Sequence, residues 1–194
     1  MSKKLDASDL VPESITTDSD SPVVIACDVT DSMDAWPGVI FSKLPYLEYE
    51  GQEYLGDGMA ISFAAVGDVT CDKYPLQVRE FVKGTKMKDE LEKLVHERGG
   101  GGTSEESYDM AAVYYSHNCD MPEAIRKPIF IFIGDEGIYS TVFAEHAATW
   151  AHCSEKKLTI EGVFEKLKQK FNVYIIRKPY RCHGNTLSDA EVRI

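Results

Sequence analysis

The sequence predicts an α/β fold with a doubly wound, mostly parallel central sheet, one antiparallel edge strand and helices on both faces. Short, continuously apolar runs rich in β-branched residues recur along the 194-residue chain, which is typical of strands buried on both faces of a parallel sheet. Segments with apolar residues at helical spacing separate these runs. Alternation of strands and helices along a chain is typical of α/β folds.

Five segments are predicted to be strands. Four of them are continuously apolar, so we expect them in the interior of the sheet: residues 23–27, 59–66, 128–133 and 172–176. Residues 77–82 alternate more strongly between apolar and polar side chains, so we expect the edge strand there.

Four segments are predicted to be helices. Their apolar residues recur at intervals of three and four over residues 36–47, 87–95, 108–115 and 160–167. Pro37 suits the first turn of the first helix, whereas Pro45 is expected to end or bend it. Four consecutive glycines, residues 99–102, are expected to end the second helix.

Acidic residues dominate the charge of the chain. The 32 Asp and Glu residues outnumber the 21 Lys and Arg residues, which gives a net charge of −11. A nucleic-acid surface normally needs a basic stripe, and none is visible, so we expect no nucleic-acid partner and, for the same reason, no membrane partner. A metal cation or a basic protein face suits this sign of charge better.

The first residues differ in composition from the rest. Residues 1–21 are polar and acidic, and we expect them to form a disordered leader before a single domain over residues 22–194. The leader lacks the apolar core of a secretory signal, and the longest apolar runs are too short to span a bilayer. We therefore expect a cytoplasmic protein.

Five cysteines lie far apart in the sequence, and no C-x-x-C pair occurs. This pattern favours reduced thiols over a disulfide framework. His152–Cys153 and Cys182–His183 invite a zinc interpretation, but adjacent Cys and His lack the usual two-residue separation, so ordinary thiols and imidazoles are favoured. His117 falls in a helical stretch and is expected at the surface or at the boundary of the core.

Carboxylates follow three of the predicted buried strands, as Asp28, Asp68 and Asp135. Because ligands bind beyond the carboxyl ends of the strands in open α/β sheets, we expect these side chains at one functional edge. Carboxylates held together repel each other unless a proton or a cation intervenes. A hard divalent ion, which takes oxygen ligands, is the natural candidate.

Hydroxyl groups lie close to the first of these acids in the sequence. Asp28, Thr30 and Ser32 are two residues apart, so an extended or turning segment can place one carboxylate and two hydroxyls around a single point. The glycine run leads to Thr103, which adds a hydroxyl at the start of a predicted helix.

Purely structural roles remain open for the same residues. The strand-end aspartates could be turn formers. Thr30 and Ser32 could cap the helix that follows them. Thr103 with Glu106 also fits a Thr-x-x-Glu capping box.

The set resembles the metal ion-dependent adhesion site (MIDAS) of von Willebrand factor A-type (vWA) domains, also called integrin I-like domains. That site consists of an Asp-x-Ser-x-Ser segment after the first strand, a later Thr and a later Asp. The resemblance extends over roughly residues 22–180 by the order of elements. The similar positions in this chain are Asp28, Thr30, Ser32, Thr103 and Asp135.

The resemblance implies a Rossmann-like vWA fold and a role for each of these residues. Thr30 and Ser32 would bind the ion directly through their hydroxyls, and Thr103 directly or through water. Asp28 and Asp135 would act mainly through bound water or as anchors of the ligating residues. The implied ion is Mg²⁺, with Mn²⁺ or Ca²⁺ as alternatives, and its open coordination position takes an Asp or Glu side chain from a partner protein.

In this family the site is a binding device and usually not an enzyme centre. We therefore expect a divalent-metal-dependent protein-binding module with an intracellular assembly or adaptor role. The resemblance implies partners in assembly or chaperone complexes, in several cases beside AAA-type ATPases.

The sequence departs from the family pattern at several positions. Thr30 replaces the first Ser, Asp31 replaces the usual Gly, and Glu136 stands where Gly is common. The added acids would favour the ion and repel an acidic ligand. Asp68 and Gly102 flank the site without belonging to the five family positions. The family fold also usually has a sixth strand and a closing helix, for which little sequence remains, so either these are lacking or the C-terminal edge is unusual.

Two other functions remain open. An Asp after the first strand is also where haloacid dehalogenase-type phosphohydrolases keep their nucleophile, but those enzymes need a second carboxylate two positions on, where this chain has Thr30. No Lys is obviously placed to steady the charge of a phosphoryl group. The third interpretation is a vWA-like scaffold with a silent metal site, which Asp31 and Glu136 motivate.

Overall fold

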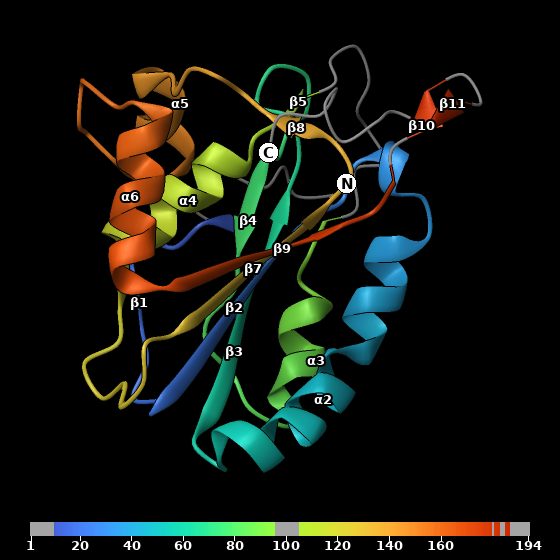
Figure 1. Ribbon diagram of the computed structural model, residues 1–194, viewed down its shortest axis with the longest axis vertical. Helices are drawn as coiled ribbons and strands as arrows, with labels where there is room; N and C mark the ends of the chain where they lie inside the picture. Colours follow the sequence, from blue (N-terminus) through green and yellow to red (C-terminus); the bar gives the residue numbers. More distant parts are fainter. Residues whose placement is uncertain (1–9, 96–104, 180, 183–184, 187–194) are drawn as a thin grey trace, which may run out of the picture.

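A five-stranded sheet forms the centre of the computed structural model, which describes residues 10–95, 105–179, 181–182 and 185–186 (Figure 1). Its strands are β2 (Ser21–Asp28), β3 (Met59–Val66), β4 (Leu76–Val78), β7 (Ile129–Gly134) and β9 (Asn172–Arg177). They lie in the order β4-β3-β2-β7-β9. All neighbours run parallel except β4, which pairs antiparallel with β3. The general prediction of an α/β fold with a mostly parallel sheet and one antiparallel edge strand is confirmed.

Helices cover both faces of this sheet (Figure 1). On one face lie α2 (Trp36–Leu55) and α3 (Lys86–Leu91), and on the other α4 (Tyr108–His117), α5 (Ala144–Trp150) and α6 (Ile160–Lys170). Successive side chains of a strand point to opposite faces, so β2 contributes to both cores. Val24 and Ala26 pack on the α4 side, and Val23 and Ile25 pack on the α2 side.

The helix α4 packs against both the sheet and α6 and is buried along almost its whole length. On the sheet side, the rings of Tyr108 and Phe132 meet edge to face with a centroid distance of 5.9 Å. Tyr115 and Phe130 meet in the same way at 5.2 Å. This packing fixes the N-terminal end of α4 beside the carboxyl end of β7.

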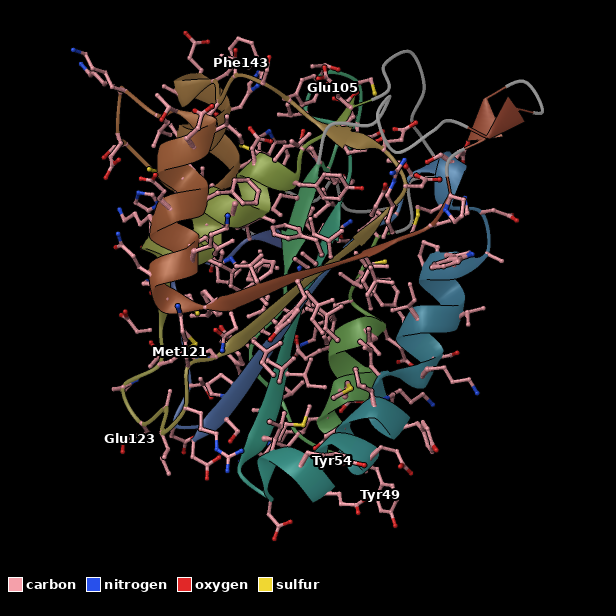
Figure 2. The ribbon with its side chains drawn as sticks, in the orientation of Figure 1. Tyr49, Tyr54, Glu105, Met121, Glu123 and Phe143 are labelled. Carbon is pink, nitrogen blue, oxygen red and sulfur yellow. The ribbon has the colours of Figure 1, made fainter. Side chains whose placement is uncertain are left out.

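The helix α2 is longer than predicted. Pro45 does not end it, because the helix runs for 20 residues through that position. Proline has no backbone N–H and leaves one helical hydrogen bond unmade. However, Leu44 and Glu48 are buried before and after it, and the Glu48 carboxylate accepts hydrogen bonds from the Gly84 backbone N–H at 2.8 and 2.7 Å. Toward its C-terminal end, Tyr49 and Tyr54 project from the outer side of the helix (Figure 2).

The N-terminal segment packs onto the domain from Leu10 onward. Leu10, Val11 and Ile15 are buried in the core on the α4 side of the sheet. The strand β1 (Ile15–Thr16) pairs in parallel with β6 (Cys119–Asp120). The prediction of a disordered leader over residues 1–21 is therefore wrong for residues 10–21, and residues 1–9 lie outside the described part of the chain.

Several short elements were not predicted from the sequence. They are the helix α5, the pair β1 and β6, a 3₁₀ turn η1 (Asp31–Met33), the parallel pair β5 (Glu105–Glu106) and β8 (Gly137–Ile138), and the hairpin β10 (Arg181–Cys182) and β11 (Asn185–Thr186). Within the described residues, β9 is the outermost strand of the main sheet on its side. None of the described helices combines the length and the hydrophobicity that crossing a membrane requires.

Candidate functional site

Three aspartates meet at the carboxyl edge of the central strands, as the sequence predicts. Asp28 is the last residue of β2, Asp68 follows β3 by two residues, and Asp135 comes directly after β7. The registers that pair Asp28 with Val66 and Cys27 with Ile133 bring these strand ends level. All three side chains are buried, with at most 2% of their surface exposed.

Asp28 is linked to the two hydroxyl residues that follow it. Its Oδ1 accepts hydrogen bonds from the backbone N–H of Thr30 at 2.9 Å and from the Thr30 hydroxyl at 2.6 Å. The Thr30 hydroxyl also lies 3.1 Å from Oγ of Ser32, which the 3₁₀ turn η1 brings back toward the strand end. Ser32 then donates to Oδ1 of Asp135 at 2.8 Å. Four of the five predicted site residues therefore form one connected network.

The capping alternatives for these hydroxyls are wrong. The helix α2 is preceded by Ala35, and Thr30 makes no side-chain capping bond to η1. The capping box is also wrong, because Glu106 lies in β5 and α4 begins only at Tyr108. Thr103 itself, with Gly102, lies outside the described residues.

Tyr108 binds the second carboxylate oxygen of Asp28. Its hydroxyl donates to Oδ2 at 2.9 Å from the first residue of α4. Gly134 makes room for it, since a Cβ at that position would lie 1.7 Å from the Tyr108 oxygen. The sequence places Tyr108 in the apolar stripe of a helix, which predicts a core residue and gives no sign of its link to the site.

Lys178 brings a positive charge to the same network. It follows β9, and its ammonium group donates to Oδ2 of Asp135 at 2.9 Å and to the backbone carbonyl of Ser32. Asp135 thus accepts from Ser32 on one oxygen and from Lys178 on the other. The sequence carries no local signal for this residue, because it reaches the site only through the pairing of β9 with β7.

Two further buried acids lie close to the network. Glu106 and Glu136 are 3% and 6% exposed, and their carboxyl groups share a hydrogen bond. Burial raises the pKa of Glu106, and the charges of Asp28 and Glu136 raise it further. Oε2 of Glu106 has no hydrogen-bond partner among the described residues.

Burial also changes the protonation of Asp28. It raises the pKa of that carboxyl to about 6, although the hydrogen bonds from Thr30 and Tyr108 act in the opposite direction and Asp135 adds a repulsive charge. Acids that are buried and this close together are stabilised either by protons or by a cation.

Asp68 repeats the turn that Asp28 forms. The tripeptide Asp-Val-Thr occurs after both β2 and β3, and Thr70 donates to Oδ1 of Asp68 through its N–H at 2.8 Å and its hydroxyl at 2.7 Å. Tyr139 donates to the same oxygen at 2.9 Å. Burial opposes ionisation of Asp68, but the bonds from Thr70 and Tyr139 hold its pKa below the usual range. An Asp-x-Thr turn is therefore a local feature, and what distinguishes Asp28 is its connection to Ser32 and Asp135.

The oxygen donors fit a hard divalent cation. Two hydroxyls, from Thr30 and Ser32, lie between the carboxylates of Asp28 and Asp135, and such ions take oxygen ligands. Asp31 is exposed at the mouth of the site.

A cleft of about 820 Å³ opens beside these donors. Thr30 and Asp31 line one side, and Pro37, Gly38 and Val39 of α2 are among the residues that line the other. This cleft gives an external group access to the edge of the network.

Comparison with protein-family models finds no family that matches the chain, and comparison with curated proteins finds no significant match.

Proposed function

We propose that this chain is a divalent-cation-dependent protein-binding module of the vWA type, with Mg²⁺ bound at the carboxyl edge of the sheet. The observation that carries the proposal is the network from Asp28 through Thr30 and Ser32 to Asp135, whose last two members are 103 positions apart. The strand order, with one antiparallel strand at the β4 edge, supports the vWA interpretation of the fold.

In this proposal the hydroxyls of Thr30 and Ser32 bind the ion, and Thr103 adds a third hydroxyl. Asp28 holds the Thr30 hydroxyl in place, and Asp135 holds the Ser32 hydroxyl, through the hydrogen bonds described above. Mg²⁺ supplies a coordination position that a partner's carboxylate fills. Few direct carboxylate ligands leave the ion's charge incompletely neutralised, which favours binding of such an external acid.

The cleft beside the site supports a protein partner with a particular charge pattern. Asp31 and Asp34 line it together with Pro37 and Val39, so a bare acidic peptide would be repelled by the first two. We infer that the partner's Asp or Glu is accompanied by a basic residue and an apolar residue. Assembly or chaperone complexes within the cell, including those with AAA-type ATPases, are the class of partner that the family resemblance suggests.

The test is a comparison of two matched aspartates by isothermal titration with Mg²⁺ and Mn²⁺. Asp28→Asn weakens binding at least about tenfold, because anchors of metal ligands typically contribute that much. Asp68→Asn is the control, since Asp68 forms the same Asp-Val-Thr turn without being one of the proposed site residues. Equal metal affinities for both variants and the unmodified chain would contradict the proposed site.

The phosphohydrolase interpretation is less well supported. Lys178 does supply a positive charge near the site. However, Asp28 has no exposed surface, and both of its oxygens accept hydrogen bonds, so neither is free to attack phosphorus.

A vWA-like scaffold whose metal site binds no ion remains the main alternative within the same fold. Lys178 motivates it, since an ammonium group can replace a metal ion as the counter-charge of Asp135. Absence of any Mg²⁺ or Mn²⁺ binding, together with partner binding that survives a chelator, would favour the scaffold over our proposal.

A further inference from the structure

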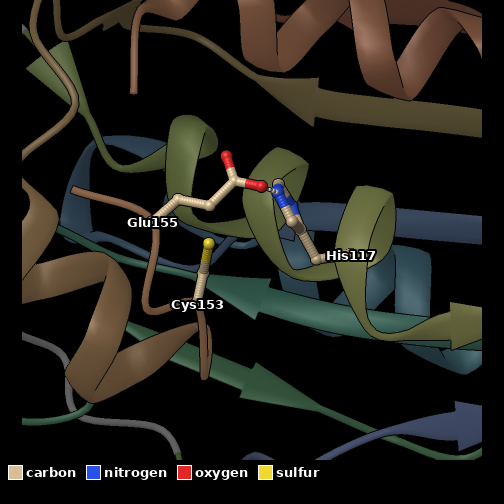
Figure 3. A group of neighbouring side chains, drawn as sticks. All are labelled: His117, Cys153 and Glu155. Atoms are coloured by element: carbon tan, nitrogen blue, oxygen red, sulfur yellow. Dashed lines mark ion pairs between the residues drawn. The ribbon is translucent and has the colours of Figure 1, made fainter. Parts of the chain in front are cut away.

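Three side chains with metal-binding atoms meet at the far end of α4, away from Tyr108. His117 is the last residue of that helix, and Cys153 and Glu155 lie in the segment between α5 and α6 (Figure 3). One ligand atom from each lies within 4.8 Å of the other two. Nε2 of His117 is 3.3 Å from Oε1 of Glu155.

The orientation of His117 leaves Nε2 facing this group. Its Nδ1 lies 2.8 Å from the backbone carbonyl of Val113, to which it donates in the tautomer that leaves Nε2 unprotonated, and 2.8 Å from the Ser116 hydroxyl. Nε2 is buried and faces a carboxylate oxygen of Glu155 at 3.3 Å. A histidine whose other nitrogen donates to a backbone carbonyl is the arrangement that metal-binding histidines usually show.

Nε2 of His117 and the carboxylate of Glu155 together can bind a cation. In the neutral tautomer whose proton is on Nδ1, the lone pair of Nε2 and the carboxylate of Glu155 are both acceptors, and they face each other at 3.3 Å. A cation between the two groups relieves this repulsion. Lys166, 3.4 Å from the same carboxylate oxygen, shows that Glu155 already attracts cations.

The backbone holds Cys153 in place before any ion binds. Its N–H donates to the carbonyl of Ala147 at 3.1 Å. Asn118, directly after α4, donates to the carbonyl of Ala151 at 2.6 Å. His152, which adopts a positive φ of 48°, ties the same turn to Val11 with an Nε2–O distance of 2.9 Å. The thiol is buried and points toward the other two side chains (Figure 3).

We propose that His117, Cys153 and Glu155 form a zinc site whose fourth ligand is water. Zinc favours tetrahedral sets of imidazole nitrogen, thiolate sulfur and carboxylate oxygen, with bonds of about 2.0–2.3 Å. Such bonds place the ligand atoms about 3.3–3.8 Å apart, so the present cluster needs only small side-chain movements. On binding, the Cys153 thiol loses its proton to the solvent, and the thiolate takes the metal.

This site is independent of the proposed Mg²⁺ site. Its donors include sulfur and nitrogen, which favour zinc over magnesium. It lies at the C-terminal end of α4, whereas Tyr108, which contacts Asp28, is the first residue of that helix. A zinc ion would join α4 to the α5–α6 connection.

The experiment uses Co²⁺ as a spectroscopic probe for zinc in the full chain. Cys71→Ser and Cys182→Ser are introduced first, so that the exposed thiol of Cys71 and the thiol that precedes His183 in the sequence do not contribute. We expect a thiolate-to-cobalt absorption band that Zn²⁺ abolishes. Cys153→Ser removes the band, whereas Cys119→Ser, which alters another buried thiol close to α4, retains it. A band that survives Cys153→Ser would overturn the proposal, as would the absence of any band.

Two further variants test the other ligands. His117→Gln and Glu155→Gln each weaken Zn²⁺ binding at least about tenfold, and circular dichroism checks that both variants fold. Glu155 is exposed, so its substitution does not disturb the core. X-ray absorption should find one sulfur at about 2.3 Å from the zinc. Affinities unchanged in both variants mean that Cys153 binds zinc without them, which also contradicts the site.

Discussion

Lys178 gives the candidate site a positive charge of its own. Its ammonium group donates to Asp135 and to the carbonyl of Ser32, at the position from which a cation would neutralise the same carboxylate. A bound Mg²⁺ and this ammonium group repel each other. We therefore expect Lys178 to compete with the ion while stabilising the protein that lacks it.

Replacing Lys178 separates these two effects. Lys178→Met should tighten Mg²⁺ binding about tenfold, which corresponds to about 1.4 kcal/mol, because the competing charge is gone. Without Mg²⁺ the same variant should lose about 1.5–3 kcal/mol of stability, since Asp135 loses a charged hydrogen-bond donor. Titration calorimetry and denaturant unfolding measure the two quantities. Weaker Mg²⁺ binding by the variant would instead make Lys178 a positioning residue.

Gly134 is the second residue on which the geometry of the site depends. A methyl group there would collide with the Tyr108 hydroxyl, which a Cβ would approach to 1.7 Å. Gly134→Ala should therefore destabilise the protein by about 1–3 kcal/mol and weaken Mg²⁺ binding, because Tyr108 can no longer reach Asp28. Denaturant unfolding and the same titration check both effects.

The control for this substitution lies in α2. A Cβ at Gly38 meets no atom within 4 Å, and alanine is about 1 kcal/mol more favourable than glycine inside a helix. Gly38→Ala should therefore raise stability. If Gly134→Ala also raised it, the close approach of Tyr108 to Gly134 would be incorrect.

At the scale of elements, α4 is unusual because it carries a buried acid in its first turn. Asp109 is 2% exposed, and one of its oxygens has no hydrogen-bond partner among the described residues. Burial raises the pKa of this carboxyl to about 7, although backbone N–H groups at the start of the helix partly offset the effect. The helix therefore prefers the protonated acid.

This preference predicts a pH dependence of stability. The folded-state pKa of Asp109 is raised, so its contribution is fully present below its unfolded value near 3.8 and is lost as the pH rises through about 7. In the presence of a chelator, the protein should be more stable at about pH 5.5 than at about pH 8. Asp109→Asn should reduce this difference and stabilise the protein at the higher pH. Denaturant midpoints at the two pH values measure it.

An exposed acid in the first turn of another helix serves as the control for Asp109→Asn. Asp89 lies in the first turn of α3 and is solvent-exposed. Asp89→Asn should leave the pH dependence unchanged. Equal pH profiles for Asp109→Asn and the unmodified chain would show that Asp109 is not the group responsible.

At the scale of the whole molecule, the sequence predicts the sheet better than its surroundings. The buried strands β2, β3, β7 and β9 have continuous apolar runs, which are a local signal. The packing of Leu10 and Val11 could not be predicted, because these residues stand among polar neighbours and their partners are distant in sequence. The helix α2 passes through Pro45 because tertiary contacts outweigh a local preference.

Some residues of the candidate site could likewise be predicted from the sequence, and others could not. Asp28, Thr30 and Ser32 are close in sequence, so their common position could be predicted from spacing alone. Lys178 and Tyr108 reach the site only through the sheet register and helix packing, which leave no pattern in the sequence. The cluster proposed to bind zinc could not be predicted for the same reason, because His117 is separated from Cys153 by the whole of α5.

The central place of β2 has a consequence for how the protein folds. Ser32 and Asp135 are 103 positions apart, and Lys178 contacts Ser32 across 146 positions. The groups proposed to hold the ion therefore come together only after the distant strand β7 has paired with β2, a slow and non-local event. Mg²⁺ should then slow the unfolding rate while leaving the refolding rate unchanged, because its contacts form after the transition state. Stopped-flow kinetics with and without the ion would reveal this asymmetry.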